Sequence, residues 1–397
     1  MTRRRILLST YGTRGDVEPL VALAVQLRAR GAGVRMCTPP DEEFAHRLAG
    51  LGIDHVPVGP PIRALMRRTP SAAELARYRT ELLEAQFAVL PSAAHGCDAL
   101  VVAGLAQVAA RSVAEAAGIP YVYVTYAAVN LPSPHHPPPP RPGWPEPAEA
   151  GNAARWEHDA RLVDAQFREP LNGHRAALGL PPVGGVRDHV YSDRPWLAAD
   201  PALGPWPPAP GLDVVQTGAW IQPDERPLPA DLAAFLAAGP PPVYVGFGSI
   251  GPAPDVARWA VGISRAHGHR VIVSRGWADL DLLDGEEDCF AVGEVNHQRL
   301  FPELAAVIHH GGAGTTQVAA RAGVPQVVVP LPVADNPYWA GQVAAHGVGA
   351  ALDGPAATRE SLAEAFELAL ASGRRARALS TGIRTDGAAV AAHLLLS

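Results

Sequence analysis

Lysine is missing from this chain, because all 33 of its basic residues are arginine. A P-loop needs a lysine on the nucleotide phosphates, and Schiff-base or pyridoxal enzymes need a lysine amine, so the sequence excludes both classes. Cysteine is scarce: Cys37, Cys97 and Cys289 are far apart and odd in number. That pattern is typical of a reducing cytoplasm rather than of a disulfide framework.

Long apolar runs and basic runs are scarce as well. No stretch reaches the roughly 18 apolar residues of a membrane span, and the apolar core near the start is too short for a signal peptide. The net charge is −6, and the one basic run is the short stretch at residues 3–5, which argues against nucleic acid as a partner. We therefore expect a cytoplasmic enzyme without stable membrane insertion.

Short apolar runs alternate with helical spacing along most of the 397 residues. The pattern predicts strands at residues 4–10, 34–39, 99–104 and 121–126, and again at 243–249, 270–277, 289–295, 305–312 and 326–330. Such alternation is typical of a parallel sheet with helices on both faces. We expect an α/β fold of two doubly wound, Rossmann-like domains with a cleft between them. Ligands of such sheets bind beyond the carboxyl ends of the strands.

Proline-rich stretches interrupt this pattern. Residues 131–147 hold too many prolines for a helix or an inner strand, so this segment is a plain surface loop or a stiff loop that shapes a substrate site. A second stretch, rich in proline and glycine, spans residues 202–218. We expect an N-terminal domain over residues 1–203, a linker over 204–217, a C-terminal domain over 218–380 and a last helix over 381–397.

The segment "IHHGGAGTT", residues 308–316, joins an expected strand to an expected helix. A glycine-rich turn that enters a helix offers free backbone N–H groups and the positive end of the helix dipole, so it predicts an anion site that fits a phosphate. Thr315 or Thr316 can cap the helix or donate to the anion. Zinc binding is disfavoured, because adjacent strand residues point to opposite faces and no third ligand is near. A capped helix with a merely structural histidine remains the alternative.

A second turn, "GFGS" at residues 246–249, follows the first expected strand of the C-terminal half. It would direct Ser249 and its amides toward the same place, and two such turns together suggest a diphosphate. The dinucleotide fingerprint G-x-G-x-x-G follows neither strand, and no carboxylate cluster suited to Mg²⁺ is present.

Two acids stand where expected strands meet helices. Asp16 follows the first strand, and Asp335 follows the strand at residues 326–330. Each can be a helix N-cap. Asp16 can instead be a general base that takes a proton from an acceptor hydroxyl.

The motifs "GFGS", "VNHQ", "HHGGAGTT", "AGVPQVVVP" and "ADNPY", in this order and spacing, resemble the GT-B glycosyltransferases of family 1. With "STYGTRGDVEPLVALAVQLRARGA", "VQTGAWI" and "IRTDGAAVAAHLLL", the whole chain resembles the actinobacterial transferases that glycosylate aglycones of vancomycin and teicoplanin type. The resemblance implies an N-terminal domain for the acceptor, a C-terminal domain for a UDP- or dTDP-sugar, and a last helix that returns to the N-terminal domain. It also implies an inverting transfer without a metal or other cofactor.

The resemblance assigns roles residue by residue. It implies Asp16 as the base and Asp335 as the acid that contacts sugar hydroxyls or assists catalysis. For donor binding it implies a set that lies in "GTRGD", in the two glycine-rich turns and in "VNHQ" and "ADN": Thr13, Ser249, Val295, Gln298, His310, Gly311, Gly312, Thr315 and Asn336. Many relatives carry glutamine where this chain has Asn336, so the preferred sugar is open. Serine is frequent in relatives at the position of Thr13.

"PSPHHPPPPRPG" resembles the proline-rich loop of the transferases that act first, on the phenol of the central 4-hydroxyphenylglycine. We therefore expect a glycopeptide aglycone as the acceptor. One alternative is a macrolide or other polyketide transferase of the same fold. The other is a non-catalytic nucleotide-sugar-binding protein, and the intact Asp16, His310 and Asp335 disfavour this second alternative. A sugar-nucleotide epimerase would need an acid-rich site that is not apparent in the sequence.

Overall fold

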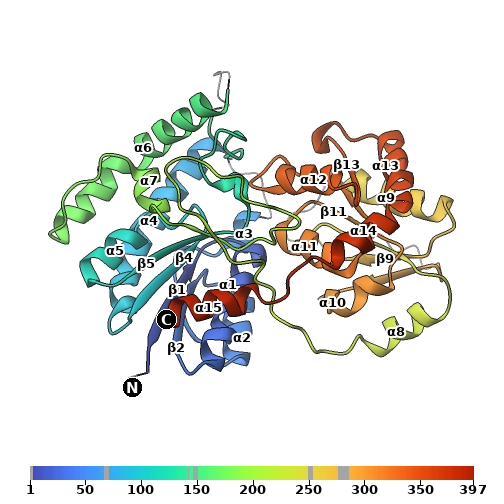
Figure 1. Cartoon of the computed structure of the whole chain (residues 1–397), viewed down its shortest axis with the longest axis horizontal. Coiled ribbons are helices and arrows are strands. Elements are labelled where there is room, and N and C mark those ends of the chain that lie inside the picture. The colour runs from blue at the N-terminus through green and yellow to red at the C-terminus, as the bar shows by residue number, and fades with distance from the viewer. Residues whose placement is uncertain (1–2, 67–70, 142, 146–150, 249–253, 276–285) are drawn as a thin grey trace. The chain divides into compact units, whose positions relative to one another are not determined.

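A computed structural model describes residues 3–66, 71–141, 143–145, 151–248, 254–275 and 286–397 (Figure 1). The chain divides into two compact units. Unit 1 comprises Met1–Ala199, Trp206–Gln222 and Thr385–Ser397, and unit 2 comprises Asp200–Pro205 and Pro223–Arg384. Each unit is built on one parallel sheet, which confirms the predicted pair of doubly wound, Rossmann-like domains.

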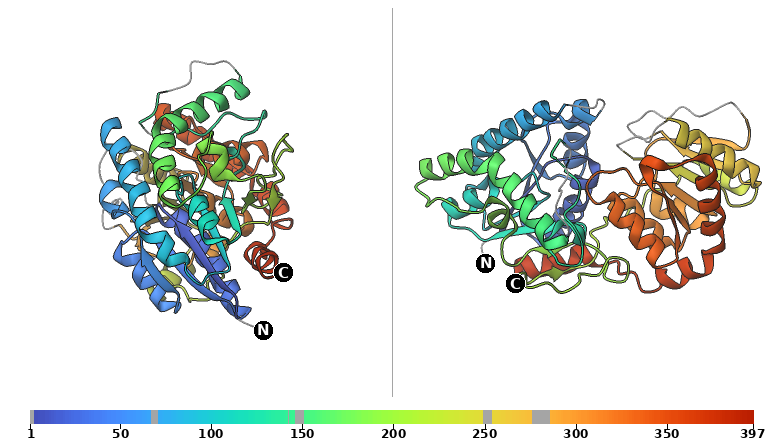
Figure 2. Two further views of the ribbon diagram at one scale, coloured as in Figure 1. Left: turned by 90° about the vertical axis from the view of Figure 1, so that its left-hand side faces the viewer. Right: turned by 90° about the horizontal axis from the view of Figure 1, so that it is seen from above.

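The sheet of unit 1 has seven strands in the order β3-β2-β1-β4-β5-β6-β7. These are β1 (Arg5–Thr10), β2 (Gly33–Thr38), β3 (Asp54–Pro57), β4 (Ala99–Ala103), β5 (Tyr121–Thr125), β6 (Trp196–Leu197) and β7 (Val215–Gln216). The helices are α1 (Arg14–Ala29), α2 (Glu42–Gly50), α3 (Ile62–Met66), α4 (Ala72–Ala94), α5 (Ala110–Ala117), η1 (Ala128–Asn130), α6 (Asn152–Ala177), α7 (Val186–Tyr191) and α15 (Gly387–Leu396). Helix α15 packs against α1 of the same unit, and it is the red helix beside the carboxyl end of the chain in Figure 2.

The sheet of unit 2 has six strands in the order β10-β9-β8-β11-β12-β13. These are β8 (Val243–Gly246), β9 (Val271–Ser274), β10 (Cys289–Val292), β11 (Ala306–His309), β12 (Gln326–Val328) and β13 (Gly349–Ala351). The helices are α8 (Ala230–Ala237), α9 (Pro254–Ala266), α10 (His297–Leu300), η2 (Phe301–Glu303), α11 (Ala313–Ala322), α12 (Asn336–Ala345), η3 (Gly354–Ala356), α13 (Arg359–Ala371) and α14 (Gly373–Ser380).

Alternate residues of the unit 2 strands enter two different cores, one on each face of the sheet. Val243 and Val245 of β8 pack with α9 and α13 residues such as Ala257 and Phe366. Tyr244, between them, packs on the other face with Leu300 and Phe301. Both faces are therefore buried, which explains why the sequence shows continuous apolar runs rather than polar–apolar alternation.

The same strand order occurs in both sheets. The first strand of each unit, β1 or β8, lies between the second strand and the fourth, β4 or β11. Helices therefore leave in opposite directions on the two sides of this point, and the carboxyl ends of the two central strands are left open for a ligand. The functional candidates Asp16 and His310 follow β1 and β11, at this point of their own units.

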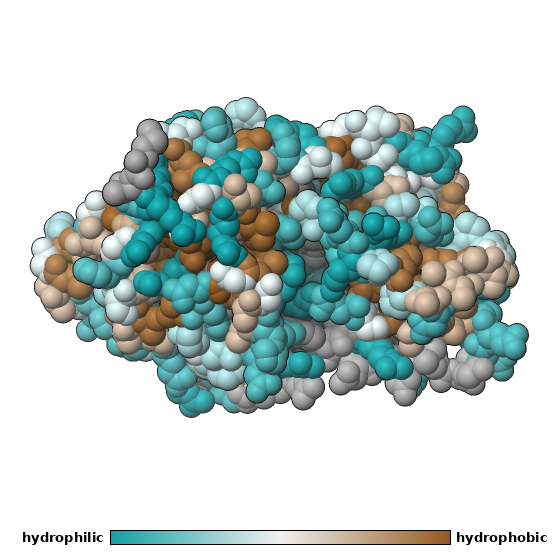
Figure 3. All heavy atoms as spheres, turned by 90° about the horizontal axis from the view of Figure 1, so that it is seen from below, coloured by the Kyte–Doolittle hydropathy of each residue, from teal (hydrophilic) through white to brown (hydrophobic). Residues whose placement is uncertain are grey.

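Polar and apolar side chains are interspersed on the face drawn in Figure 3. Among the described residues, the exposed large hydrophobic side chains are Leu368 and Leu394. Within the described ranges, no helix combines the length and hydropathy that crossing a bilayer requires.

Candidate functional site

The turn from β1 to α1 folds the Asp16 carboxylate back over its own backbone. Asp16 Oδ2 accepts the N–H of Thr13 at 2.8 Å, and the Asp16 N–H donates to the Thr13 carbonyl at 2.9 Å. A Cβ at Gly12 would collide with Oδ2, so only glycine permits this close approach. The structure thus brings Thr13 and Asp16 together in the first turn of α1, in the reciprocal arrangement of a capping box.

Two further residues of unit 1 surround Asp16. Tyr126, which follows β5, donates its hydroxyl to the Asp16 carbonyl at 2.9 Å. Burial raises the pKa of Tyr126 well above its usual value, so this hydroxyl stays a donor. A Cβ at Gly104, after β4, would lie 3.8 Å from Asp16 Oδ1. Sequence analysis missed both contacts, because they come from strands that only the sheet order places beside β1.

In unit 2, the ring of His310 lies between two glycines. A Cβ at Gly248 would lie 2.7 Å from His310 Cε1, and one at Gly312 would lie 2.6 Å from Nε2. Burial lowers the pKa of His310 to about 4, so the imidazole is neutral near pH 7 and has one N–H to donate. Its buried Nδ1 has no hydrogen-bond partner among the described residues.

Helix α11 begins beside this ring without a side-chain cap. Gly312 occupies the N-cap position and gives no side-chain hydrogen bond. The N–H groups of the first turn, at residues 313–315, have no carbonyl within the helix to bond, as at every helix start. Thr316 is not available to an anion, since its hydroxyl donates to the Gly312 carbonyl at 2.9 Å. Thr315 is half-buried on the first turn, which leaves it as the hydroxyl beside these amides.

Gly311 connects this turn to the loop that carries the second acid. Its φ is +88°, in the left-handed region that favours glycine. A Cβ at Gly311 would lie 2.8 Å from the carbonyl oxygen of Asn336. The structure therefore places the "HHGG" turn directly against the start of α12.

Asp335 stands at the N-cap position of α12 but does not cap it. Its Oδ2 instead accepts the indole N–H of Trp339 at 3.0 Å. Burial raises the pKa of the Asp335 carboxyl, and the indole donor opposes that effect. The preceding residue, Ala334, has a φ of +49°, which is unusual for a residue with a side chain and typical of strained functional loops. Asn336 is 5% exposed.

The remaining sites predicted for donor binding lie elsewhere. Val295 is buried with Leu300 and Phe301 in one core of unit 2. Gln298 is a half-buried residue of the short helix α10. Asn296, between them, caps that helix by accepting the Arg299 N–H at 3.1 Å. Ser249 lies outside the described residues.

The structure therefore brings together His310, Gly311, Gly312, Thr315, Asp335 and Asn336 in unit 2, and Thr13 with Asp16 in unit 1. Val295 and Gln298 belong to a separate loop after β10. Among the described residues, no group of three or more histidine, cysteine, aspartate or glutamate side chains is arranged to hold a metal ion.

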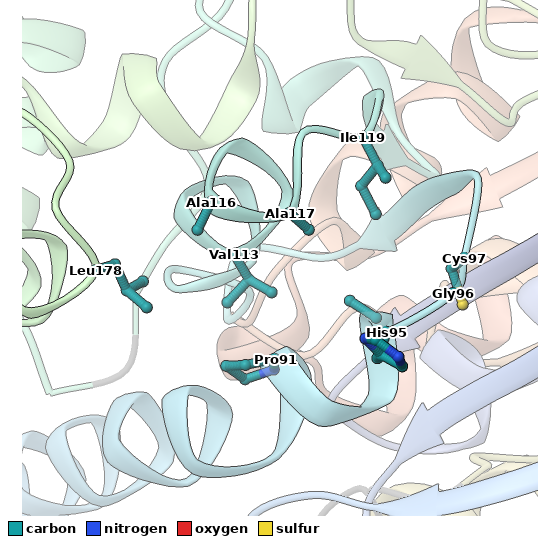
Figure 4. A pocket seen from close by; sticks show the side chains of 10 residues that line it. Pro91, His95, Gly96, Cys97, Val113, Ala116, Ala117, Ile119 and Leu178 are labelled. Carbon is teal, nitrogen blue, oxygen red and sulfur yellow. The ribbon is translucent and has the colours of Figure 1, made fainter.

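A pocket of about 280 Å³ lies elsewhere in unit 1 (Figure 4). Pro91, His95, Cys97, Val113 and Ile119 are among its lining residues. Cys97 and Ile119 precede β4 and β5, so the pocket is at the amino ends of the strands, opposite to the edge that holds Asp16. Because doubly wound sheets bind ligands at the carboxyl ends, we assign this pocket no part in the site.

Comparison with known proteins finds a matching family model for each half of the chain. Residues 6–131 match the glycosyltransferase family 28 N-terminal domain, and residues 284–392 match the C-terminal domain described as erythromycin biosynthesis protein CIII-like. Among solved structures, the glycotransferase of kitacinnamycin has a TM-score of 0.74 at 19% identity and covers 100% of this chain and 99% of its own. The fold is therefore that of the GT-B glycosyltransferases.

Two relatives from Amycolatopsis orientalis are much closer in sequence. The vancomycin aglycone glucosyltransferase is 55% identical over 399 residues, 99% of this chain and 97% of the relative. The dTDP-epi-vancosaminyltransferase is 50% identical over 386 residues, 94% of this chain and 92% of the relative. This chain belongs to their family of glycosyltransferases.

Proposed function

We propose that the protein is an inverting hexosyltransferase that moves a sugar from a UDP- or dTDP-sugar to a hydroxyl of a glycopeptide antibiotic aglycone. The observation that carries this proposal is the uncapped start of α11 beside His310. The N–H of the neutral His310 ring and the first amides of α11 offer hydrogen-bond donors at one place, and the buried Nδ1 of His310 has no partner among the described residues. A diphosphate is an acceptor-only ligand that fits such a site.

The donor domain is unit 2. The amides of residues 313–315, the His310 ring and the Thr315 hydroxyl hold the diphosphate, with Ser249 as a further contact. Val295 and Gln298 flank the base of the nucleotide, and Asp335 with Asn336 binds sugar hydroxyls. The name of the dTDP-epi-vancosaminyltransferase, half of whose residues match this chain, supports a nucleotide-sugar donor.

The acceptor domain is unit 1, and Asp16 is its general base. As Asp16 takes the proton of the acceptor hydroxyl, that oxygen attacks the anomeric carbon from the face opposite to the diphosphate. The bond from the anomeric carbon to the diphosphate oxygen breaks, and the electron pair leaves with the diphosphate. His310 stays neutral and stabilises the new charge as a hydrogen-bond donor, together with the α11 amides.

The aglycone class is supported by the 55% identity to a transferase whose name states the vancomycin aglycone. Described residues of the proline-rich loop contact other parts of unit 1. Arg141 of this loop donates to the buried Asp159 of α6 at 3.0 Å, and Arg141 and Arg79 both place their guanidinium groups about 5 Å from the Trp144 ring, at 5.1 and 5.0 Å. We expect the phenol of the central 4-hydroxyphenylglycine as the acceptor, since a phenol (pKa about 10, as for tyrosine) is within reach of a single carboxylate base.

The experiment is a matrix of donors and acceptors followed by mass spectrometry. A vancomycin-type heptapeptide aglycone and a macrolide aglycone are each incubated with the protein and with UDP- and dTDP-hexoses. The expected product is the heptapeptide plus one hexose, with loss of the product when the phenol of the central residue is methylated. Transfer to the macrolide alone would show that the acceptor is a polyketide and not a glycopeptide aglycone. Binding of a nucleotide-sugar without any transfer would contradict the proposal that the protein is an enzyme.

A further inference from the structure

His309, the neighbour of the proposed diphosphate ligand His310, is bonded on both sides of its ring. It is fully buried at the end of β11. Its Nδ1 accepts the N–H of Gly311 at 3.1 Å. Its Nε2 lies 2.9 Å from Oε1 of Gln326, the first residue of the neighbouring strand β12.

These two contacts define the protonation of the ring. Because Nδ1 accepts a backbone N–H, the ring proton is on Nε2, which donates to Gln326 Oε1. The other end of the carboxamide, Gln326 Nε2, donates to the Thr316 carbonyl at 3.3 Å, so the amide has one orientation that satisfies both partners. Burial lowers the pKa of His309 to about 3. The ring therefore stays neutral and Nδ1 stays an acceptor.

The bonds of this pair end on both sides of the anion turn. Gly311 directly follows His310 and has the left-handed φ of +88°. Thr316 is the first residue after the amides of residues 313–315, and its own N–H donates back to the Gly312 carbonyl at 3.0 Å. The acceptor at His309 Nδ1 thus orients the peptide after His310, and the donor at Gln326 holds the far side of the same turn.

We propose that His309 and Gln326 are positioning residues: they do not touch the diphosphate themselves, but they hold residues 310–316 in the conformation that binds it. This inference rests on the proposed function and specifies how its diphosphate site is maintained. If His309 and Gln326 only filled space, His309 would not need to accept the Gly311 N–H and Gln326 would not need to donate to the Thr316 carbonyl.

The first test compares His309→Asn with His309→Leu. An asparagine can accept the N–H of the residue two positions later through its own side chain, as in an Asx turn, whereas leucine cannot. Calorimetric titration measures the dissociation constants of dTDP and UDP, and those of dTMP and UMP for comparison. It needs no acceptor substrate, so it reports on the diphosphate site alone. We expect His309→Leu to weaken diphosphate binding about tenfold, since it leaves a buried N–H unsatisfied. We expect His309→Asn to stay within about threefold, with monophosphate binding changed less in both variants.

The second test uses a matched pair of buried glutamines. Gln326→Leu removes the bonds to His309 and Thr316. Gln317, the next residue after Thr316, has a buried side chain that bonds outside the turn, since its Oε1 accepts the Asp200 N–H at 2.8 Å, and Gln317→Leu removes this bond. Both variants should lower the melting temperature. Only Gln326→Leu should also weaken dTDP or UDP binding, by about fivefold.

The inference would be overturned if Gln326→Leu and Gln317→Leu bound dTDP and UDP equally well. It would also be overturned if His309→Asn and His309→Leu lost the same amount of nucleotide affinity. If His309→Leu does not fold, the comparison of the two glutamine variants is the test. A wild-type protein that binds neither dTDP nor UDP would contradict the proposed function itself. The two failures are therefore distinguishable.

Discussion

The turn after β1 in unit 1 and the turn after β11 in unit 2 each lie where the first and the fourth strand of their sheet are neighbours, but the two turns leave different groups available. In unit 1 an acidic side chain of the helix itself bonds at the helix start, since Asp16 of α1 accepts the Thr13 N–H. In unit 2 the helix starts at Gly312 with no side-chain cap. His310, beside that start, is neutral, and its Nδ1 has no hydrogen-bond partner within the described part of the chain.

This difference shows how one topology supports two chemical roles. The first turn presents a carboxylate, which accepts hydrogen bonds and protons. The second presents amides and an imidazole, which can donate hydrogen bonds to the proposed diphosphate. Both turns lie at the carboxyl ends of strands in sheets of the same topology, so the proposed base and the proposed anion site differ through the residues of the turns and not through the fold.

The largest expected effect follows from removing the carboxylate of unit 1. Asp16→Asn keeps the shape of the turn but removes the proton acceptor, so kcat should fall by roughly 10²–10⁴-fold. Activity should return in part as the pH approaches about 10, where a phenolic acceptor ionises without help. Steady-state rates from pH 6 to 10 check this prediction.

A matched control for Asp16→Asn is Asp41→Asn. Asp41 is a buried carboxylate elsewhere in unit 1, and it accepts the N–H groups of Ile62 and Arg63 at 2.8 and 3.0 Å. That variant should lose stability and keep the wild-type pH profile. A near-normal rate for Asp16→Asn at pH 7 would remove Asp16 as the base.

A smaller effect is expected from the acid of unit 2. Asp335→Asn should raise the donor KM about tenfold, because a charged hydrogen bond to the sugar is lost, and should change the ranking of donor sugars. Initial rates with a panel of UDP- and dTDP-hexoses measure both quantities. If Asp335→Asn abolishes turnover while the donor KM stays constant, Asp335 belongs to the chemical step.

A still smaller effect is expected from Trp339→Phe, which keeps an aromatic ring at this buried position and removes the indole donor to Asp335. We expect about a threefold rise in donor KM at pH 7.5. Burial already raises the pKa of Asp335 and the indole opposes this rise, so its loss raises the pKa further. The acid limb of the pH profile should therefore shift to higher pH, and an unshifted limb would show that this bond does not control the carboxylate.

No effect is expected from chelation. The proposed site neutralises the diphosphate with the α11 amides and His310, so turnover should be unchanged after dialysis against EDTA. Loss of activity that Mg²⁺ or Mn²⁺ restores would show that the leaving group needs a cation which these groups do not replace.

Sequence analysis predicted the central strands well. The strands β1, β2, β4, β5, β8, β9, β10, β11 and β12 lie within one residue of the predicted ranges or inside them. Strand alternation predicts opposite orientations for His309 and His310, and the two rings have different neighbours, Gln326 for His309 and Gly248 for His310.

Other features lay beyond sequence reasoning for physical reasons. Strands β6 and β7 have two residues each, too few to show a periodicity. The contacts of Asp16 with Tyr126 and of His309 with Gln326 join residues of different strands, and only the sheet order reveals them. The bond of Trp339 to Asp335 spans four residues at a helix start. That spacing was visible in the sequence, but Asp335 was interpreted there from its position alone.

The most direct test of the central claim, that the uncapped start of α11 with His310 stabilises the departing diphosphate, is kcat of His310→Ala at saturating donor. Loss of one such donor should lower kcat by about 10²–10³-fold, while the melting temperature stays close to that of the wild type, because the buried Nδ1 bonds no protein group among the described residues. An unchanged kcat with a folded variant would contradict the account.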